Sequence, residues 1–269
     1  MNVVQEWPEP PVRVQTLADA QVIPERYIKL PSERPHPSSA AGGAGSVPVV
    51  DLGGLKRGAA ERQATMLAVS DACRDWGFFQ VVNHGVSLEL MARMREVWKG
   101  FFDLPMEEKQ AYANSPVTFE GYGSRLGVKK GAILDWGDYY FLQLFPHSIK
   151  NYDKWPSLPA SLRCARALMD HVEPIPDAFV VNVGDQIQVL TNGRYTSVEH
   201  RVVVNAATER LSMAFFYNPQ DDLLIHPAKE LVADGTSPMY KPKTFKEYKL
   251  CMRMLGPCGK MLADAMEAT

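Results

Sequence analysis

Two neighbouring stretches decide the fold of this chain: Ser197-Val-Glu-His-Arg-Val-Val-Val-Asn205 and Arg210-Leu-Ser-Met-Ala-Phe-Phe-Tyr-Asn-Pro219. Both are rich in β-branched and aromatic residues, so each predicts a β-strand. Side chains two residues apart share one face of a strand. Arg210 therefore shares a face with Ser212, and His200 points to the same side as the valines two and four residues after it.

A polar side chain that faces inward needs a partner. A neutral imidazole such as His200 suits a ferrous ion. The guanidinium of Arg210 takes a carboxylate through two hydrogen bonds and the hydroxyl of Ser212 adds a third, which indicates a dicarboxylate ligand. The alternatives are a core histidine whose hydrogen bonds are satisfied and an ion pair of Arg210 with Glu199 or Glu209. Short motifs alone do not separate these interpretations.

The rest of the chain indicates helices first and strands later. Strands are predicted at 47–52, 78–83, 178–183 and 211–217, with a further strand-like aromatic run at 132–144. Helices are predicted at 59–75 with Gly77 behind it, after Ser87, from Leu104, weakly at 160–171, after Asp185 and at 241–267. Asn192-Gly193 ends the helix after Asp185 or, alternatively, forms a hairpin turn. Because no regular βαβ alternation occurs, we expect an antiparallel α+β fold.

Composition narrows the function classes. The chain has 269 residues, 46% of them hydrophobic, and a net charge of −2, so nothing indicates binding to nucleic acid or an acidic membrane. We find no secretory signal and no apolar run long enough to span a membrane. The four cysteines form no C-x-x-C pair, which favours reduced thiols and the cytoplasm, with the nucleus also open.

Several runs resemble a known family. Ala72-Cys-Arg-Asp-Trp-Gly-Phe-Phe-Gln-Val-Val-Asn-His-Gly85 and residues 178–219 resemble the plant iron(II)/2-oxoglutarate-dependent dioxygenases. Four further runs resemble the jasmonate-induced oxygenases, which hydroxylate jasmonic acid: Trp7–Leu17, Ile23–Ile28, Phe119–Arg125 and Gly131–Trp136. The similarity covers nearly the whole chain on both sides of one break.

The resemblance implies a double-stranded β-helix, or jelly-roll, core with an N-terminal region of helices and strands packed on it. The core is expected to be incomplete here. The implied organisation is an arm and connector at 1–46, an N-terminal oxygenase region at 47–160, a deletion junction at 161–176, a partial jelly-roll at 177–240 and a helical tail at 241–269.

The resemblance also implies cofactors. It assigns His200 to the distal iron ligand, and Arg210 with Ser212 to the grip on the far carboxylate of 2-oxoglutarate. Fe(II) and 2-oxoglutarate are thus the implied cofactors, with ascorbate as reductant. In a complete relative, oxidative decarboxylation of 2-oxoglutarate to succinate drives hydroxylation of an unactivated C–H bond.

For the substrate, the resemblance implies a small carboxylated metabolite of the oxylipin type. Phe216 and Tyr217 would line or support its pocket. The segment containing Lys249 and Arg253 resembles the C-terminal helix that closes over substrate. The family places an arginine where this chain has Lys249, and lysine keeps the charge without the planar fork.

One part of the family pattern is missing. Between Leu162 and Pro174 the family carries a long helix, the His-X-Asp ligand pair and several strands, whereas here Ser161–Asp170 runs almost directly into His171–Asp177. Because a facial triad needs two imidazoles and one carboxylate, we expect this shortened form to have little or no turnover. The strands left without neighbours would expose backbone and apolar faces. We therefore keep two alternatives: a non-catalytic isoform that binds ligands or a full-length paralogue, and an unstable truncated product.

The chain offers only poor candidates to replace the missing iron ligands. His171-Val-Glu173 is the only His-X-acid run, and it reads as an exposed loop beside prolines. The remaining candidates are expected to be structural or to lie in loops: His36, His84, His147, His226, Asp135 and Asp138. The glycine run 121–127 does not fit a nucleotide loop, because its third glycine is one residue late.

Overall fold

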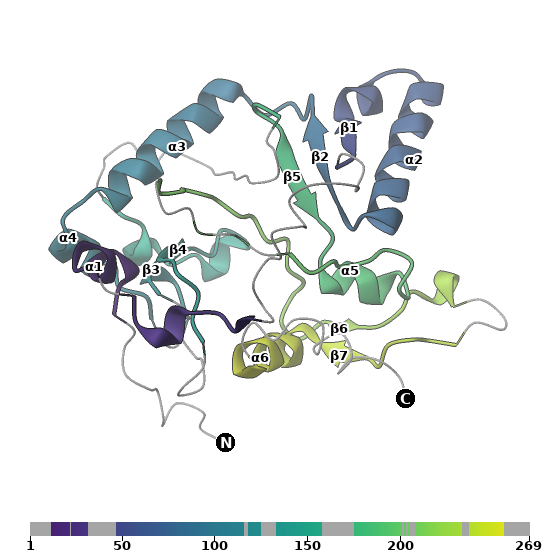
Figure 1. The fold of residues 1–269 in the computed structure, drawn as a ribbon. Helices are drawn as coiled ribbons and strands as arrows, with labels where there is room; N and C mark the ends of the chain where they lie inside the picture. The colour runs from purple at the N-terminus through teal and green to yellow at the C-terminus, as the bar shows by residue number, and fades with distance from the viewer. Residues whose placement is uncertain are drawn as a thin grey trace. The chain divides into compact units, whose positions relative to one another are not determined.

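The computed structural model describes residues 12–21, 23–31, 47–115, 118–124, 133–157, 175–200, 202, 204, 208–232 and 237–255 (Figure 1). It divides into two compact units. The first unit comprises Met1–Gly43, Glu96–Ala165 and Arg253–Gly256, and the second comprises Ala44–Arg95, Arg166–Met252 and Pro257–Thr269. Helices and mostly antiparallel strands occur together, which is the predicted α+β class.

A three-stranded sheet lies in the second unit. Its strands, in spatial order, are β1 (Val49–Asp51), β2 (Phe78–Val82) and β5 (Phe179–Asn182). β1 runs parallel to β2, with Val50 opposite Val81, and β5 runs antiparallel to β2. All three strands confirm predictions from the sequence.

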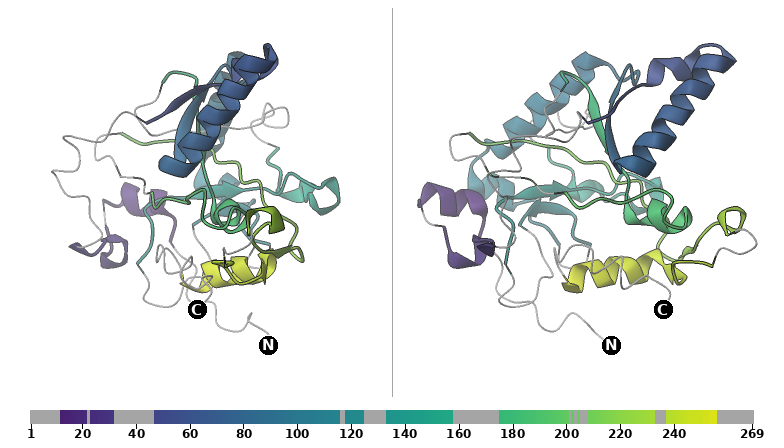
Figure 2. Two further views of the ribbon diagram at one scale, coloured as in Figure 1. Left: turned by 90° about the vertical axis from the view of Figure 1, so that its right-hand side faces the viewer. Right: turned by 45° about the vertical axis from the view of Figure 1, so that its right-hand side comes forward.

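Helix α2 (Ala59–Asp75) connects β1 to β2 and lies alongside the sheet (Figures 1 and 2). The core between them consists of Val50, Ala72, Phe79 and Val81. The spacing of Met66, Val69 and Cys73 places them on one stripe of the helix. Val69 and Cys73 pack against this core, whereas Met66 is 50% exposed. The helix therefore rests on the sheet through its C-terminal half.

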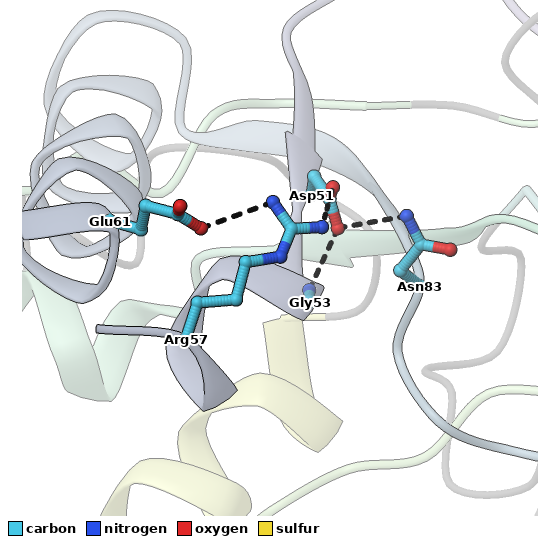
Figure 3. Close-up of polar contacts among 5 residues, drawn as sticks. All are labelled: Asp51, Gly53, Arg57, Glu61 and Asn83. Atoms are coloured by element: carbon cyan, nitrogen blue, oxygen red, sulfur yellow. Dashed lines mark hydrogen bonds and ion pairs between the residues drawn. The ribbon is translucent and has the colours of Figure 1, made fainter.

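A polar network on the surface closes the end of β1 (Figure 3). The carboxylate of Asp51 accepts hydrogen bonds from the backbone N–H of Gly53 (2.7 Å) and from the side-chain amide of Asn83 (2.9 Å). Arg57 lies between Asp51 and Glu61, at 3.5 and 3.3 Å. The bond from Asn83, followed by that from Gly53, holds the pKa of Asp51 below its usual value. The network thus fixes the turn after β1 to the turn after β2.

Gly77, directly after α2, is a position where only glycine fits. Its φ is +70°, and an added Cβ would lie 2.3 Å from the carbonyl oxygen of Thr196. We expect Gly77→Ala to lower the free energy of unfolding by about 1–3 kcal/mol, because it adds backbone strain to a clash with main chain. Urea denaturation measures this. Gly137→Ala is the control, since the space around its Cβ is open; equal losses in both variants would contradict the expectation.

A second core lies at the C-terminal end of the second unit. The elements there are α5 (Asp185–Leu190), β6 (Leu224–Ile225), β7 (Lys243–Thr244) and α6 (Phe245–Leu255), of which β6 and β7 pair antiparallel. Val189, Ile225 and Tyr240 form the core, and Tyr248 packs against it. These contacts join α5, β6 and the first turns of α6.

The start of α5 corrects one prediction. Gly184, not Asp185, occupies the N-cap, and no side chain caps the helix. Asp185 lies in the first turn and accepts a hydrogen bond of 2.6 Å from the hydroxyl of Tyr248. Asn192 (φ 50°) and Gly193 (φ 78°) follow the helix in left-handed conformations and end it, so the hairpin alternative is wrong.

The first unit contains a two-stranded antiparallel sheet of β3 (Gly121–Gly123) and β4 (Tyr139–Phe141), together with α1 (Val14–Asp19) and α4 (Met106–Gln110). The strand expected at 132–144 is confirmed only for β4 among the described residues of that run. Tyr122, on β3, is fully buried.

Lys109 is a buried cation in the first unit. Its side chain is 0% exposed, and its ammonium donates to Oε1 of Gln15 and, at 2.7 Å, to the carbonyl of Phe102. The ammonium also lies 5.8 Å from the ring centroid of Tyr122. Burial lowers the pKa of Lys109. These contacts offset the cost of burying the charge, and the bond to Gln15 joins α4 to α1.

The remaining elements are mostly short. Helix α3 (Leu88–Phe102) begins as predicted after Ser87, whose hydroxyl accepts from the N–H of Leu90 at 3.3 Å. The 3₁₀ helices are η2 (Glu25–Tyr27), η5 (Leu52–Lys56), η6 (His147–Ile149), η7 (Tyr152–Lys154) and η9 (Lys229–Leu231). Within the described ranges, no helix has the length and apolar character that crossing a bilayer requires.

The described residues of the two stretches that open the sequence analysis do not form the predicted strands. Neither the described part of 197–205 nor residues 208–219 pair with another strand (Figure 1). A strand is stabilised by hydrogen bonds to a neighbour, and no neighbour lies beside these residues in the part of the chain that is described. The predicted junction, 161–176, lies almost wholly outside the described residues.

Candidate functional site

His200 lies at the end of a well-anchored segment and is exposed. Its Nδ1 is 3.1 Å from the carbonyl oxygen of Val198. Since a carbonyl only accepts, Nδ1 carries a proton, which in the neutral ring leaves the lone pair on Nε2. This is the tautomer that ligates a metal through Nε2, with the orienting hydrogen bond on the second nitrogen.

The backbone leading to His200 is fixed by α5 and α2. Oε1 of Gln188 accepts from the N–H of Ser197 at 2.6 Å, while its amide donates to the hydroxyl of Tyr240 at 2.9 Å. The hydroxyl of Tyr195 is 2.9 Å from that of Ser70 on α2. Sequence reasoning missed Gln188, because nothing local marks a helical glutamine that binds a backbone nine residues on.

Arg210 and Ser212 lie in the segment without helix or strand, Arg210 exposed and Ser212 half-buried. Their assignment to the carboxylate of 2-oxoglutarate stays a prediction. Phe216 is 75% exposed and Tyr217 fully exposed, so neither forms a pocket wall in this chain as described. Their role toward substrate likewise stays a prediction.

Lys249 and Arg253 of α6 were predicted to contact the substrate. Lys249 forms an ion pair with Asp221, and its ammonium lies 5.3 Å from the ring centroid of Phe245. The ammonium that we predicted to bind the substrate carboxylate is therefore already paired with Asp221 of this chain. The side chain of Arg253 lies outside the described residues, although its backbone belongs to α6.

The other described histidines have structural or surface positions, as expected. His84 stacks on Phe179 with ring centroids 3.9 Å apart; its Nε2 donates to the carbonyl of Asp177 (2.8 Å), and its Nδ1 accepts from the N–H of Val86 (3.1 Å). His147 and His226 are exposed. His36, His171 and Glu173 lie outside the described residues.

The two aspartates considered as carboxylate ligands are structural. Asp138 accepts four hydrogen bonds, from the N–H groups of Val14 and Gln15 at the start of α1 and from the hydroxyls of Tyr122 and Ser124, at 2.7 to 3.3 Å. Asp135 pairs with Lys29 at 2.7 Å on the surface. Burial, reinforced by the Asp138 charge, raises the pKa of Tyr122.

These positions do not fit the iron that the resemblance implies. A facial triad requires two imidazoles and a carboxylate on one side of the ion. Across the described ranges, no group of three or more histidine, cysteine, aspartate or glutamate side chains comes together. His200 is the one predicted ligand present, and a single imidazole does not make this site.

Two family models match the chain. The model described as "non-haem dioxygenase in morphine synthesis N-terminal" matches residues 47–158, and that of the "2OG-Fe(II) oxygenase superfamily" matches 160–219. Together they cover the predicted oxygenase region, the junction and most of the predicted core.

Relatives match nearly end to end. Jasmonate-induced oxygenase 2 of Arabidopsis thaliana is 41% identical over 346 positions, which cover 96% of this chain and 93% of that protein. Jasmonate-induced oxygenase 3 of the same plant is 39% identical, covering 100% and 99%. The crystal structure of JOX2 in complex with 2OG, Fe and JA has a TM-score of 0.86 and 40% identity, covering 98% of this chain and 100% of that one.

The alignment with Jasmonate-induced oxygenase 2 is longer than this chain. Subtracting the 269 residues of this chain from the 346 positions aligned with Jasmonate-induced oxygenase 2 leaves at least 77 positions where this chain has no residue. The relative therefore carries a substantial length of sequence that has no counterpart here.

Proposed function

Because the chain belongs to the 2OG-Fe(II) oxygenase superfamily, in the group of the plant jasmonate-induced oxygenases, we propose that its function derives from hydroxylation of a small carboxylated plant metabolite, jasmonic acid first of all. Fe(II) and 2-oxoglutarate are the cofactors of this family. The observation that carries the proposal is the 0.86 TM-score, at 40% identity, to JOX2 bound to 2OG, Fe and JA.

Three side chains of this chain are proposed for the site. His200 is the iron ligand, supported by the hydrogen bond of its Nδ1 to the carbonyl of Val198, which leaves Nε2 for a metal. Arg210 and Ser212 are proposed to hold the far carboxylate of 2-oxoglutarate, supported by their spacing of two residues and the match between a guanidinium fork and a carboxylate.

This chain is further proposed to have little or no turnover. The reason is that the described residues supply one metal ligand of the three required. The at least 77 alignment positions without a residue here, the excess of 346 over 269, support a missing segment. The family's His-X-Asp pair is expected in that segment, at junction 161–176.

Succinate release tests the proposal. The purified chain is incubated with Fe(II), ascorbate and 2-oxoglutarate, with and without jasmonic acid, next to Jasmonate-induced oxygenase 2. We expect succinate to form at least about 100-fold more slowly than with the relative, because even changes outside the ligand shell of a metal cost 10–100-fold. Release stimulated by jasmonic acid and within tenfold of the relative would contradict impaired turnover.

A further inference from the structure

The segment that leads to His200 rests on α2 within the second unit. The hydroxyl of Tyr195 lies 2.9 Å from that of Ser70. The N–H of the next residue, Thr196, donates to the carbonyl of Cys73 at 3.2 Å. Both partners belong to α2. The chain is therefore fixed at two consecutive residues before it reaches the imidazole.

Gln188 on α5 supplies the next attachment. Its Oε1 accepts from the N–H of Ser197 at 2.6 Å, and its amide nitrogen donates to the hydroxyl of Tyr240 at 2.9 Å. The two contacts need opposite ends of the amide, so together they fix its orientation. Tyr240 is 4% exposed and belongs to the core that also contains Val189 and Ile225. A buried phenol thus holds the amide where it binds the backbone.

The residue after Ser197 carries the acceptor for the imidazole. The carbonyl oxygen of Val198 lies 3.1 Å from Nδ1 of His200. The side chain of Val198 lies against Gly77, where an added Cβ would be 2.8 Å from Cγ1 of the valine. Val198 is thus held by Gly77 on one side and by the anchored peptide on the other. Because the imidazole is exposed, this hydrogen bond and not close packing sets which nitrogen carries the proton.

We propose that Gln188, braced by Tyr240, is a positioning residue for the imidazole of His200. It places the carbonyl of Val198, and this carbonyl keeps the proton on Nδ1 and leaves Nε2 for a metal ion. The inference rests on the proposed function in taking His200 as a metal ligand. It does not depend on the two further ligands, because all of its contacts lie among the described residues of the second unit.

The tautomer of His200 in the metal-free chain tests the inference. Two-bond proton–nitrogen correlation NMR at about pH 8, where histidine is neutral, shows which nitrogen carries the proton. The signal is assigned by its loss in His200→Gln. We expect the Nδ1–H form to predominate. Gln188→Met keeps the length of the side chain without its hydrogen bonds and should lower the ratio of Nδ1–H to Nε2–H at least about threefold. Tyr240→Phe should lower it by a smaller factor.

Three controls accompany this measurement. Gln186→Met on the same helix should leave the ratio unchanged, since the buried amide of Gln186 has no hydrogen-bond partner in the described structure. Gln188→Glu should restore the ratio, because one carboxylate oxygen accepts from the N–H of Ser197 and the other from the hydroxyl of Tyr240, which can also donate. The signals of His226, whose Nδ1 lies 2.8 Å from the carbonyl of Pro227, should stay as they are in every variant.

Four results overturn the proposal: a predominant Nε2–H form in the unaltered chain, an unchanged ratio in Gln188→Met, an equal fall in Gln186→Met, or no recovery in Gln188→Glu. A simultaneous change at His226 also overturns it, since Gln188 would then act on the fold as a whole. None of these measurements uses iron or succinate. Failure of the positioning role is therefore distinguishable from failure of the proposed function.

Discussion

A chain in which residues 161–176 are replaced by the longer aligned segment of Jasmonate-induced oxygenase 2 is expected to release succinate at least about 100-fold faster than the unaltered chain. The segment is expected to bring a second imidazole and a carboxylate, which the described residues do not place beside His200. It is also expected to bring strands that pair with residues 211–217. Succinate formation and Fe(II) binding by equilibrium dialysis measure the two effects separately.

Two control variants of the graft distinguish the effect of the added metal ligands from the effect of the restored fold. Changing the histidine and aspartate of the grafted His-X-Asp pair to alanine should keep the repaired fold but return succinate release to background. His200→Ala in the graft should do the same. A graft that is well folded yet inactive would contradict the proposed function, whereas a graft that stays active without its ligand pair would contradict the assignment of the site.

The second large effect concerns Asp138 in the first unit. Asp138→Ala removes the acceptor of two N–H groups at the start of α1 and of the hydroxyls of Tyr122 and Ser124. We expect the free energy of unfolding to fall by about 3 kcal/mol, since each donor left unsatisfied in a buried site costs about 1–3 kcal/mol. Urea denaturation gives the value, and limited proteolysis should show faster cleavage around α1.

Asp135→Ala is the matched control, three residues away. Its ion pair with Lys29 is on the surface, with side chains 54% and 35% exposed, so its loss should cost less than about 1 kcal/mol. Equal losses in the two variants would mean that Asp138 acts only through its charge and not through the four donors that converge on it.

The sequence predicted the sheet and helices of residues 47–102 well, because their signals are local. Hydrophobic spacing marked α2, Gly77 marked its end and Ser87 marked the start of α3. In contrast, the alternation of side chains at 211–217 indicates only which face of the segment is suited to burial. A strand also needs a neighbouring strand to pair with. That neighbour is not a property of the segment, so the strand prediction was wrong for this chain.

The polar contacts were beyond sequence reasoning for a related reason. Asp138 was expected to be structural or to lie in a loop, but its partner Val14, 124 residues away, could not be named. Ser70 and Tyr195 are 125 residues apart. Spacing along the chain carries no information about such pairs. The family resemblance, which covers nearly the whole chain, identified the family and its cofactors correctly.

The amide of Gln188 gives this chain a fixed starting point for redesign. It grips the backbone three residues before His200 from one side while Tyr240 steadies it from the other. Neither partner belongs to the stretch that the relatives carry in excess. A metal centre for iron or for a different ion could thus be rebuilt around one imidazole whose backbone is already held in position. Only the two further ligands would have to be designed.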